Sequence, residues 1–301
     1  MFNEDFSQQK KASASVLLEE AYADFILSRQ AMLCRPRTVQ FYEFTLNKFV
    51  GWLAGQGVEQ ADEISARHVR AYLSDLAGRD LTDTYIHSHA RAIRTFVRFL
   101  YAEDYHPGEI KFQMPAIAKR RLPVLNSDEL RKVVSVCSNP RDLALVLLMA
   151  DTGVRRAELC ALNWGDVDIS RGTISIREGK GGKARTVIAG VRTRRALLKY
   201  RRLVASEPTS PVIQTKSGGR MTHGGLRSAL LRLGEKAGVH LSPHTLRRTF
   251  ATLSLRAGMN PLHLQGLLGH ASLEMTNHYV HMLDEDLQVA HRSFGPIDNH
   301  L

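Results

Sequence analysis

The stretch Ser242-Pro243-His244-Thr245-Leu246-Arg247-Arg248-Thr249-Phe250 decides the fold of the last third of this chain. Its serine suits a helix N-cap and its proline the first helical position, which predicts a helix over 243–257. His244 and Arg247 are three residues apart in the first turns of that helix, so their side chains are expected to point together. This helix has a predicted core stripe of Leu246, Phe250, Leu253 and Ala257. The His-Arg pair is therefore expected at the edge of a surface, where it can line a cleft.

A second basic motif, Thr152-Gly153-Val154-Arg155, lies well upstream. Its glycine interrupts a helical region that starts near Ser127 and runs to Ala150, and a bend there can aim the Arg155 guanidinium inward. Glu158, three residues on, can hold or orient that guanidinium. The competing interpretation of this arginine and glutamate is a buried structural ion pair.

Two further candidates stand in segments of different character. Lys180 lies in the turn Glu178-Gly179-Lys180-Gly181-Gly182-Lys183, between segments 173–176 and 185–188 that alternate like the strands of a hairpin. Glycines let such a turn bend so that its lysine can reach a phosphate, although a lone turn lysine is more often a flexible surface residue. Tyr279 has a hydroxyl that can hold a phosphoryl group covalently, but its helical spacing from two methionines is equally typical of a core position.

Composition limits the class of protein. The chain has 301 residues and 44% apolar side chains, enough for two domains that each have a core. Its longest uninterrupted apolar run, Leu143 to Ala150, is far shorter than a membrane span, and the acidic N-terminus does not have the pattern of a signal peptide. We therefore expect a cytoplasmic protein with no membrane partner. Three widely spaced cysteines, Cys34, Cys137 and Cys160, indicate neither a disulfide framework nor a zinc site and are expected to be reduced.

The distribution of charge points to a polyanionic partner. The formal net charge is +11, and it is uneven along the chain. Residues 1–122 hold 16 lysines and arginines against 15 acidic residues, whereas residues 123–301 hold 25 against 15. The second part should therefore dominate nonspecific affinity for DNA or RNA. Many basic surfaces never bind nucleic acid, so charge alone leaves the partner open.

Helical periodicity dominates the first part of the chain, from residue 15 to residue 104. Ser65 and either Thr82 or Asp83 suit N-caps. In the helix after Thr82, an apolar stripe is opposed by three arginines that can follow a phosphate backbone. The stripe consists of Ile86, Ile93, Val97 and Leu100, and the arginines are Arg91, Arg94 and Arg98. A solvated basic face is the competing interpretation of these arginines.

Residues 105–123 hold three prolines, a glycine and the basic cluster Lys119-Arg120-Arg121, which together predict an interdomain linker. Two domains joined in this way can close around a duplex. Beyond the linker, the pattern predicts mainly helices, at 127–150, 157–162, 192–205, 223–236, 243–257, 261–268 and 273–282.

The candidate residues, taken together, resemble the tyrosine recombinase or phage-integrase family, with Xer-type and transposon-encoded members most similar. The resemblance rests on Arg155, Glu158, Lys180, His244, Arg247, His270 and Tyr279 in this order and spacing. It implies a mainly α protein with a small β-sheet, built from two domains that form a clamp on DNA. A helical, SAM-like core-binding domain is implied over 15–104 and a catalytic domain over 124–283, joined by the linker. Residues 284–301 are then a C-terminal tail that can dock on another protomer, through Leu287, Ala290, His291 and Phe294.

The resemblance also implies how the phosphate is held. Arg155 and Arg247 would grip the non-bridging oxygens of the scissile phosphate and stabilise the charge that builds in the transition state. Glu158 would order the region around the first arginine, and His270 would donate a further hydrogen bond to the phosphate. No metal ion, cofactor or ATP is implied.

Three residues are implied in bond breaking and proton transfer. Tyr279 would attack the phosphate in line, giving a 3′-phosphotyrosyl bond and a free 5′-hydroxyl. A free tyrosine has a pKa of about 10, so His244 would assist in removing its proton during the attack. Lys180 would protonate the departing 5′-oxygen.

The implied partner is a double-stranded DNA recombination site within the nucleoid. The family assembles four protomers on two duplexes, as a homo- or hetero-tetramer, and can require a paralogous recombinase or an accessory protein. We expect further DNA contacts from Arg91, Arg94, Arg98, Lys119, Arg120, Arg121, Lys183 and Arg248.

Three other activities fit parts of the pattern. A type IB topoisomerase resembles the same residues and chemistry but relaxes DNA as a monomer, and the Xer-like N-terminal region disfavours it. A DNA-binding regulator on the same fold would recognise a site without cleaving it, and the intact catalytic set disfavours that. A metal-dependent nuclease is disfavoured because His278 and His281 lack a matching carboxylate or cysteine cluster.

Overall fold

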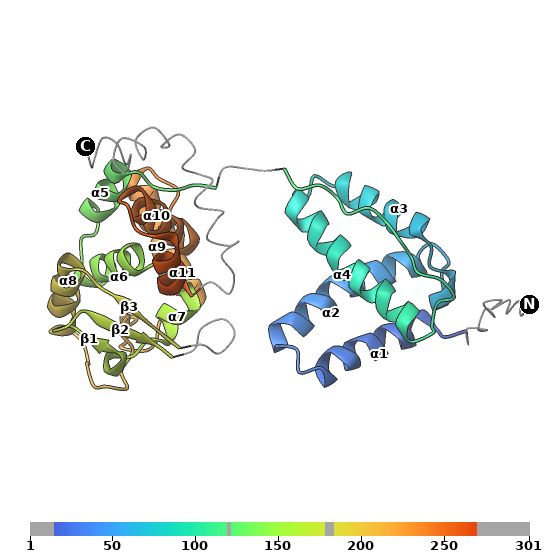
Figure 1. Ribbon diagram of the computed structural model, residues 1–301, viewed down its shortest axis with the longest axis horizontal. Helices are drawn as coiled ribbons and strands as arrows, with labels where there is room; N and C mark the ends of the chain where they lie inside the picture. The colour runs from blue at the N-terminus through green and yellow to red at the C-terminus, as the bar shows by residue number, and fades with distance from the viewer. Residues whose placement is uncertain (1–14, 119–121, 178–183, 270–301) are drawn as a thin grey trace, which may run out of the picture. The chain divides into compact units, whose positions relative to one another are not determined.

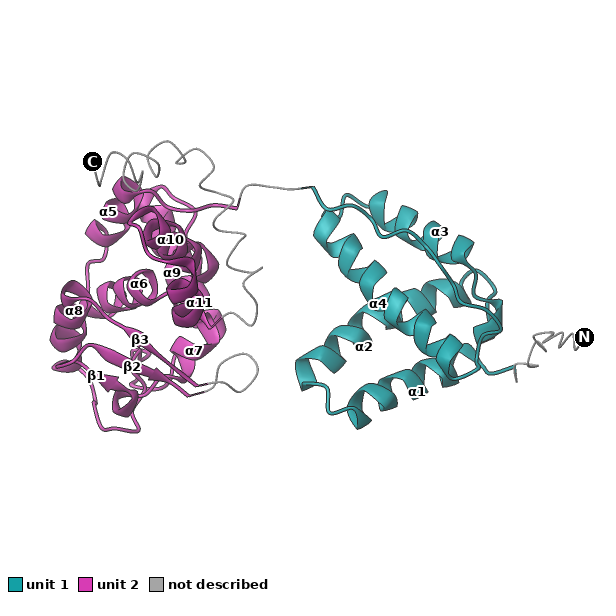
Figure 2. Ribbon diagram, in the orientation of Figure 1, with its two compact units in different colours: residues 1–120 teal, residues 121–301 magenta. Residues whose placement is uncertain are grey.

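The computed structural model describes residues 15–118, 122–177 and 184–269. The chain divides into two compact units, residues 1–120 and 121–301 (Figure 2). Several predicted residues and segments lie outside the described residues: Lys119, Arg120, Arg121, Lys180, Lys183, His270, Tyr279, the helix at 273–282 and the tail at 284–301.

The described part of the first unit is helical. Its helices are α1 (Leu18–Ala31), α2 (Pro36–Ala54), α3 (Ala66–Ala77) and α4 (Asp83–Ala102), with the short 3₁₀ helix η1 (Ala61–Glu63). The predicted N-caps form, because the Ser65 hydroxyl accepts from the backbone N–H of His68 and the Thr82 hydroxyl from that of Tyr85. Helices α1, α2 and α4 pack on one another around the fully buried Phe25 (Figure 1).

Helix α4 has the two faces that the sequence predicts. Its four apolar stripe residues are buried, with Ile93 and Leu100 at 0% exposure. Arg91 and Arg98 are exposed, and Arg94 is half-buried. The Arg91 guanidinium lies 5.4 Å from the centre of the Phe41 ring. This cation–π contact orients the Arg91 side chain on this face of the helix.

The segment predicted as a linker, 105–123, lies against the first unit over its earlier part. Ile110 is buried in the core of that unit. An imidazole nitrogen of His106 (Nε2) lies 2.9 Å from the Ile64 carbonyl oxygen, and one of His87 (Nδ1) lies 2.9 Å from that of Pro115. The extended segment therefore contributes to the packing of the first unit before the chain passes to the second.

The described part of the second unit is a group of helices with one small sheet (Figure 1). The helices are α5 (Ser127–Ser135), α6 (Pro140–Thr152), α7 (Arg156–Ala161), α8 (Val191–Arg201), α9 (His223–Ala237), α10 (Pro243–Arg256) and α11 (Pro261–Leu268), with the 3₁₀ helix η2 (Trp164–Asp166). Antiparallel strands β1 (Val167–Asp168), β2 (Thr173–Ile176) and β3 (Arg185–Ile188) form the sheet in the order β1-β2-β3. The register pairs Ile174 with Val187, and both side chains are fully buried in the core.

Strands β2 and β3 coincide with the predicted segments, whereas β1 was not predicted. Its two residues are too few to show the alternation that identifies a strand, and only pairing with β2 defines it. Alternation works for β2 because Ile174 and Ile176 both face the core.

Helix α6 is the centre of the second unit. It packs against α8 and α10, and Leu145, Leu148 and Met149 have 0% exposure. A helix covered on several sides is apolar around most of its circumference, which is why its sequence is an unbroken apolar run rather than a stripe. No helix among the described residues is long and apolar enough to cross a membrane.

The predicted core stripe of α10 is wrong in part. Leu246 is fully buried, but Phe250 and Leu253 are half-buried and Ala257 is exposed. The helix is instead buried on the side that packs against α6, and this side includes the charged Arg247, at 6% exposure. A single-stripe prediction cannot place a buried arginine, because burial of its charge depends on partners from distant segments.

Candidate active site

A glycine turn places Arg155. Helix α6 ends at Gly153, whose φ of 61° is left-handed, and an added Cβ would meet Phe250 Cδ1 at 2.4 Å and Leu268 Cδ2 at 2.9 Å. Only glycine fits both the conformation and the space. The chain then turns, and Arg155 becomes the N-cap residue of α7. The bend predicted from the Thr-Gly motif is therefore present.

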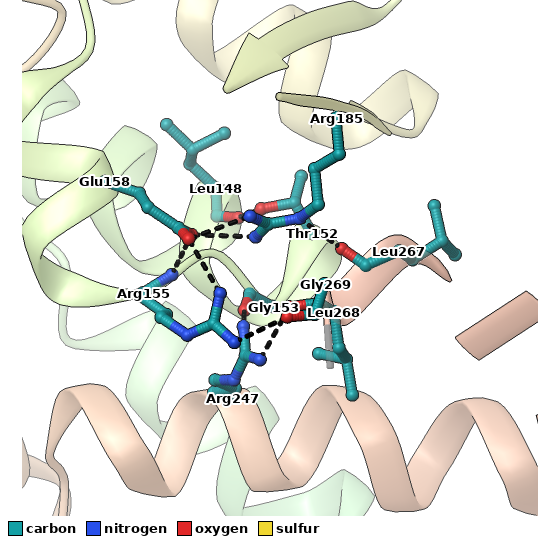
Figure 3. A network of polar contacts seen from close by, with 10 residues as sticks. All are labelled: Leu148, Thr152, Gly153, Arg155, Glu158, Arg185, Arg247, Leu267, Leu268 and Gly269. Atoms are coloured by element: carbon teal, nitrogen blue, oxygen red, sulfur yellow. Dashed lines mark hydrogen bonds and ion pairs between the residues drawn. The ribbon is translucent and has the colours of Figure 1, made fainter. Parts of the chain in front are cut away.

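The expected ion pair between Arg155 and Glu158 is also present. The Arg155 backbone N–H donates to Glu158 Oε2 at 2.8 Å, and its Nη1 donates to Oε1 at 2.8 Å (Figure 3). The Glu158 side chain is 3% exposed. Burial alone would raise its pKa, but hydrogen bonds from Arg185 and Arg155 outweigh that effect and lower the pKa of Glu158 to about 2.

Arg185 is a third arginine at this site, and its local sequence predicted only a strand residue. Its Nη1 and Nη2 donate to both oxygens of Glu158, at 2.8 and 2.7 Å, and its Nε donates to the Leu267 carbonyl at 2.8 Å. The side chain is 10% exposed. Alternation in β3 gives no signal for this role, because the partners lie far away in the sequence.

Arg247 meets the same group of residues from α10 (Figure 3). Its Nη1 donates to the Gly153 carbonyl at 2.5 Å and its Nη2 to the Leu268 carbonyl at 2.8 Å. The prediction that it lies at the edge of a surface is therefore wrong. It is buried beside Arg155, whose Nη2 donates to the Gly269 carbonyl at 2.9 Å. Arg155 and Arg247 thus converge on consecutive carbonyls at the end of α11.

His244 lies on the exposed side of α10, in its first turn. The predicted N-cap forms, because the Ser242 hydroxyl accepts from the Thr245 backbone N–H at 3.1 Å. Partial desolvation lowers the pKa of His244, and the nearby charges of Arg248, Arg156 and Arg247 lower it further. The neutral imidazole is therefore favoured near neutral pH, and a neutral imidazole can accept a proton.

Arg248, predicted to contact DNA, is anchored to its own unit. It is half-buried, and its Nε donates to the Pro123 carbonyl at 3.0 Å. Next to it, Thr249 Oγ1 accepts from the backbone N–H of Leu125 at 2.9 Å. These two residues fix the segment that enters the second unit onto α10.

The described site is suited to an anion. Two of the three guanidiniums pair with one carboxylate, Glu158, and the last carbonyls of α11 supply only the partial negative charge of a helix C-terminus. A guanidinium has five N–H donors, and the hydrogen bonds of Arg155 to described side chains and carbonyls use two of them. The remaining donors suit the oxygens of a phosphodiester, next to a histidine that can accept a proton. The fold and site thus define a domain suited to binding a phosphodiester, which follows a separate helical domain in the sequence.

Comparison with known families assigns that class. The model of the phage integrase family matches residues 123–286, and that of the phage integrase N-terminal SAM-like domain matches residues 20–104. The chain therefore belongs to the phage integrase family and is a site-specific tyrosine recombinase of the Xer type. The fold class that the sequence predicts, with a SAM-like domain before a mainly helical catalytic domain, is confirmed.

Similar proteins match over most of their length. Tyrosine recombinase XerC of Oceanobacillus iheyensis is 32% identical over 280 residues, which cover 88% of this chain and 92% of the relative. XerC of Bacillus subtilis is 33% identical over 276 residues, covering 86% and 90%. The crystal structure of XerA recombinase is 27% identical with a TM-score of 0.53, over 91% of this chain and 98% of that one. A lambda integrase dimer bound to a COC′ core site shares the fold, with a TM-score of 0.75 at 18% identity over 89% and 78%.

Proposed function

We propose that Arg155 and Arg247 form the phosphate clamp with which this recombinase cuts and rejoins DNA. The observation that supports this most strongly is that their guanidiniums donate to the consecutive carbonyls of Gly269 and Leu268, at 2.9 and 2.8 Å, and so lie side by side. Two fixed cations can hold both non-bridging oxygens of one phosphate. They stabilise the extra negative charge of the transition state without having to reorganise.

The chemistry then follows the order that the family resemblance implies. Tyr279 attacks the scissile phosphorus, the bond to the 5′-oxygen breaks, and a 3′-phosphotyrosyl bond forms. His244, which its lowered pKa keeps neutral, accepts the tyrosine proton, and Lys180 gives a proton to the departing 5′-oxygen. His270 donates a further hydrogen bond to the phosphate. A 5′-hydroxyl from another strand reverses these steps, so rejoining needs no ATP, metal or other cofactor.

We propose double-stranded DNA as the substrate, held in a clamp between the two units. Several similar solved structures are complexes of integrases or recombinases with DNA. Arg91 and Arg98 are exposed on α4 and suit contacts to the phosphate backbone. The same proposal includes association with the nucleoid. It also includes further DNA contacts from Arg94, Lys119, Arg120, Arg121, Lys183 and Arg248.

The active assembly in this proposal is a tetramer on two duplexes, of this chain alone or with a paralogous recombinase or accessory protein. Residues 284–301 are proposed to link the protomers. Removing them should leave binding to a single site intact and weaken the pairing of two duplexes. Unchanged recombination by the shortened protein would contradict this role.

A nicked suicide duplex tests the chemistry. The duplex carries a site selected from host DNA by binding to the full chain, and the reaction is run in EDTA. We expect a covalent protein–DNA adduct that peptide mass spectrometry maps to Tyr279. The matched control is Tyr279→Phe, which removes only the hydroxyl and should bind the duplex without forming the adduct.

Other results would favour the other activities. An adduct with relaxation of supercoiled DNA, and no exchange between two duplexes, would indicate a type IB topoisomerase. Tight binding without an adduct would indicate a regulator or an obligatory partner protein. Cleavage that EDTA abolishes would indicate a metal-dependent nuclease.

A further inference from the structure

Every nitrogen of the Arg185 guanidinium has a hydrogen-bond partner. Two nitrogens form a bidentate pair with Glu158, and the third donates to the Leu267 carbonyl. A bidentate pair fixes both the distance and the plane of a guanidinium. Its guanidinium is bound to both oxygens of Glu158, so it is not itself placed to receive a phosphate.

The end of α11 is held by three arginines in succession. Arg185 donates to the carbonyl of Leu267, Arg247 to that of Leu268 and Arg155 to that of Gly269 (Figure 3). The last carbonyls of a helix lack partners within the helix and carry partial negative charge. The two proposed phosphate-binding arginines therefore share their anchor with Arg185.

The backbone of Gly269 lies directly against Arg185. An added Cβ on this glycine would lie 3.0 Å from Arg185 Cδ and 3.2 Å from its Nε, and the glycine φ is 62°. The arginine stem thus covers the left-handed turn that closes α11. His270, the next residue in the sequence, is a proposed phosphate ligand and lies outside the described residues.

Glu158 connects Arg185 to Arg155. Its Oε1 accepts from Nη1 of both arginines, and its Oε2 accepts from Arg185 Nη2 and from the Arg155 backbone. Without Arg185, the buried carboxylate would keep only one cation, and Arg155 would be drawn toward a bidentate pair with it. That rotation would take the Arg155 guanidinium away from the Gly269 carbonyl and from the phosphate.

We propose that Arg185 is a positioning residue of the recombinase site. It occupies Glu158 and fixes the last turn of α11, so that Arg155 keeps one edge directed at the scissile phosphate. This role rests on the proposed function of Arg155 as a phosphate ligand. Displacement of a reacting group by about 1 Å can reduce a rate by about 10²-fold, so the effect is expected in the rate of cleavage rather than in DNA affinity.

The test compares Arg185→Met and Arg185→Lys with matched changes at Arg194. Arg194 is also an arginine of the second unit that donates to two carbonyls, those of Ile169 and Ser170, and whose stem lies against a glycine, Gly172. Arg194→Met and Arg194→Lys therefore remove the same kind of anchor without touching Glu158 or α11. Single-turnover adduct formation is measured at saturating suicide duplex, and the dissociation constant by fluorescence anisotropy.

We expect Arg185→Met to slow adduct formation by about 10²-fold while the dissociation constant changes by less than about threefold. Arg185→Lys should recover part of the rate, because a lysine keeps the charge but cannot make the bidentate pair. The Arg194 variants should stay within about threefold of the parent rate. Loss of rate in the Arg194 variants equal to that in the Arg185 variants would refute a specific role.

A neutral scissile linkage separates positioning from general damage to the fold. A methylphosphonate replaces one charged non-bridging oxygen, so an arginine aimed at that oxygen contributes less. The defect of Arg185→Met relative to the parent should then shrink at least about tenfold, as should the defect of Arg155→Ala. An equal defect on both linkages would overturn the positioning role. Absence of any Tyr279 adduct from the parent protein on the normal linkage would instead overturn the proposed function itself.

Discussion

Glu158→Gln should destabilise the second unit by about 3 kcal/mol near neutral pH. The carboxylate accepts four hydrogen bonds from Arg155 and Arg185, and its pKa is lowered from the ordinary value of 4.5 to about 2. The lowered pKa corresponds to about 3 kcal/mol of preference for the charged form in the folded state. A glutamine cannot supply that charge, and its own N–H₂ group would face guanidinium donors.

The pH dependence identifies the source of this free energy. A carboxylate whose folded pKa is lowered stabilises the fold fully above its unfolded pKa, and that contribution is lost as the pH falls toward the folded pKa. The parent and the Gln variant should therefore differ by a constant amount above about pH 5.5. At pH 3.5 the difference should be smaller by about 1 kcal/mol, because the unfolded parent then binds a proton at this position that the folded parent does not.

The assay needs a signal from the second unit alone, and the two tryptophans of the chain provide one. Trp52 lies in the first unit, and Trp164, at 2% exposure, lies in the core of the second. In a Trp52→Phe background, urea unfolding followed by fluorescence reports the second unit, which can be treated separately from the first. The control is Glu129→Gln, since Glu129 also closes a capping box but is only half-buried and bonds to a backbone N–H.

Two results would refute this reasoning. A loss of less than about 1 kcal/mol at pH 7 would mean that the cost of burying the carboxylate cancels its arginine hydrogen bonds. A loss of about 3 kcal/mol that stays constant down to pH 3.5 would mean that shape rather than charge matters at this position. Glu129→Gln should destabilise the second unit by less than about 1 kcal/mol, whichever of these two results the Glu158 variant gives.

Three further predictions concern the site and the division into units. Because the pKa of His244 is lowered, the rate of single-turnover adduct formation at limiting DNA should stay constant as the pH falls past 6.5. The rate should decrease only in more acidic buffer. His244→Gln should abolish that acidic limb, and an unchanged limb would assign it to another group. Gly153→Ala should destabilise the second unit by about 3 kcal/mol in urea unfolding, because strain adds to collision with neighbouring side chains. Gly238→Ala, with a similar φ and open space, should cost only about 1 kcal/mol, and equal losses would contradict the collision. A fragment of residues 15–118 should melt at a higher temperature than one of residues 15–104, because only the longer fragment keeps the segment that packs on the helices. Identical melting temperatures would show that this segment adds no stability.

The sequence predicted correctly those strand ends and helix caps that depend on neighbouring residues alone. The ends of β2 and β3 follow from alternation over a few residues, and the Ser242 and Thr82 caps follow from side-chain chemistry next to a helix start. The order of the motifs also predicted the class of protein correctly, including the SAM-like domain. Each of these predictions needs only residues that are near one another in the sequence or a motif order that the family resemblance supplies.

The parts that were missed depend on distant segments. Arg185 and Leu267 are 82 residues apart in the sequence, and Arg247 and Gly153 are 94 apart, so neither contact has a local signature. The burial of Arg247 follows from those contacts, because a charged side chain enters a core only when carbonyls or carboxylates are already placed around it. Packing of Ile110 on the first unit is equally invisible in a proline-rich segment that has no periodicity.

The way these arginines are anchored explains how one site can be both stable and ready for a phosphate. Clustered guanidiniums repel one another, and a fold without bound DNA must offset that repulsion. Glu158 supplies one full negative charge, and the end of α11 supplies dipoles that neutralise only partly. A second carboxylate would neutralise the cluster more completely but would compete with DNA for the same donors. Backbone carbonyls hold Arg155 and Arg247 in place while leaving the net positive charge that a phosphodiester needs.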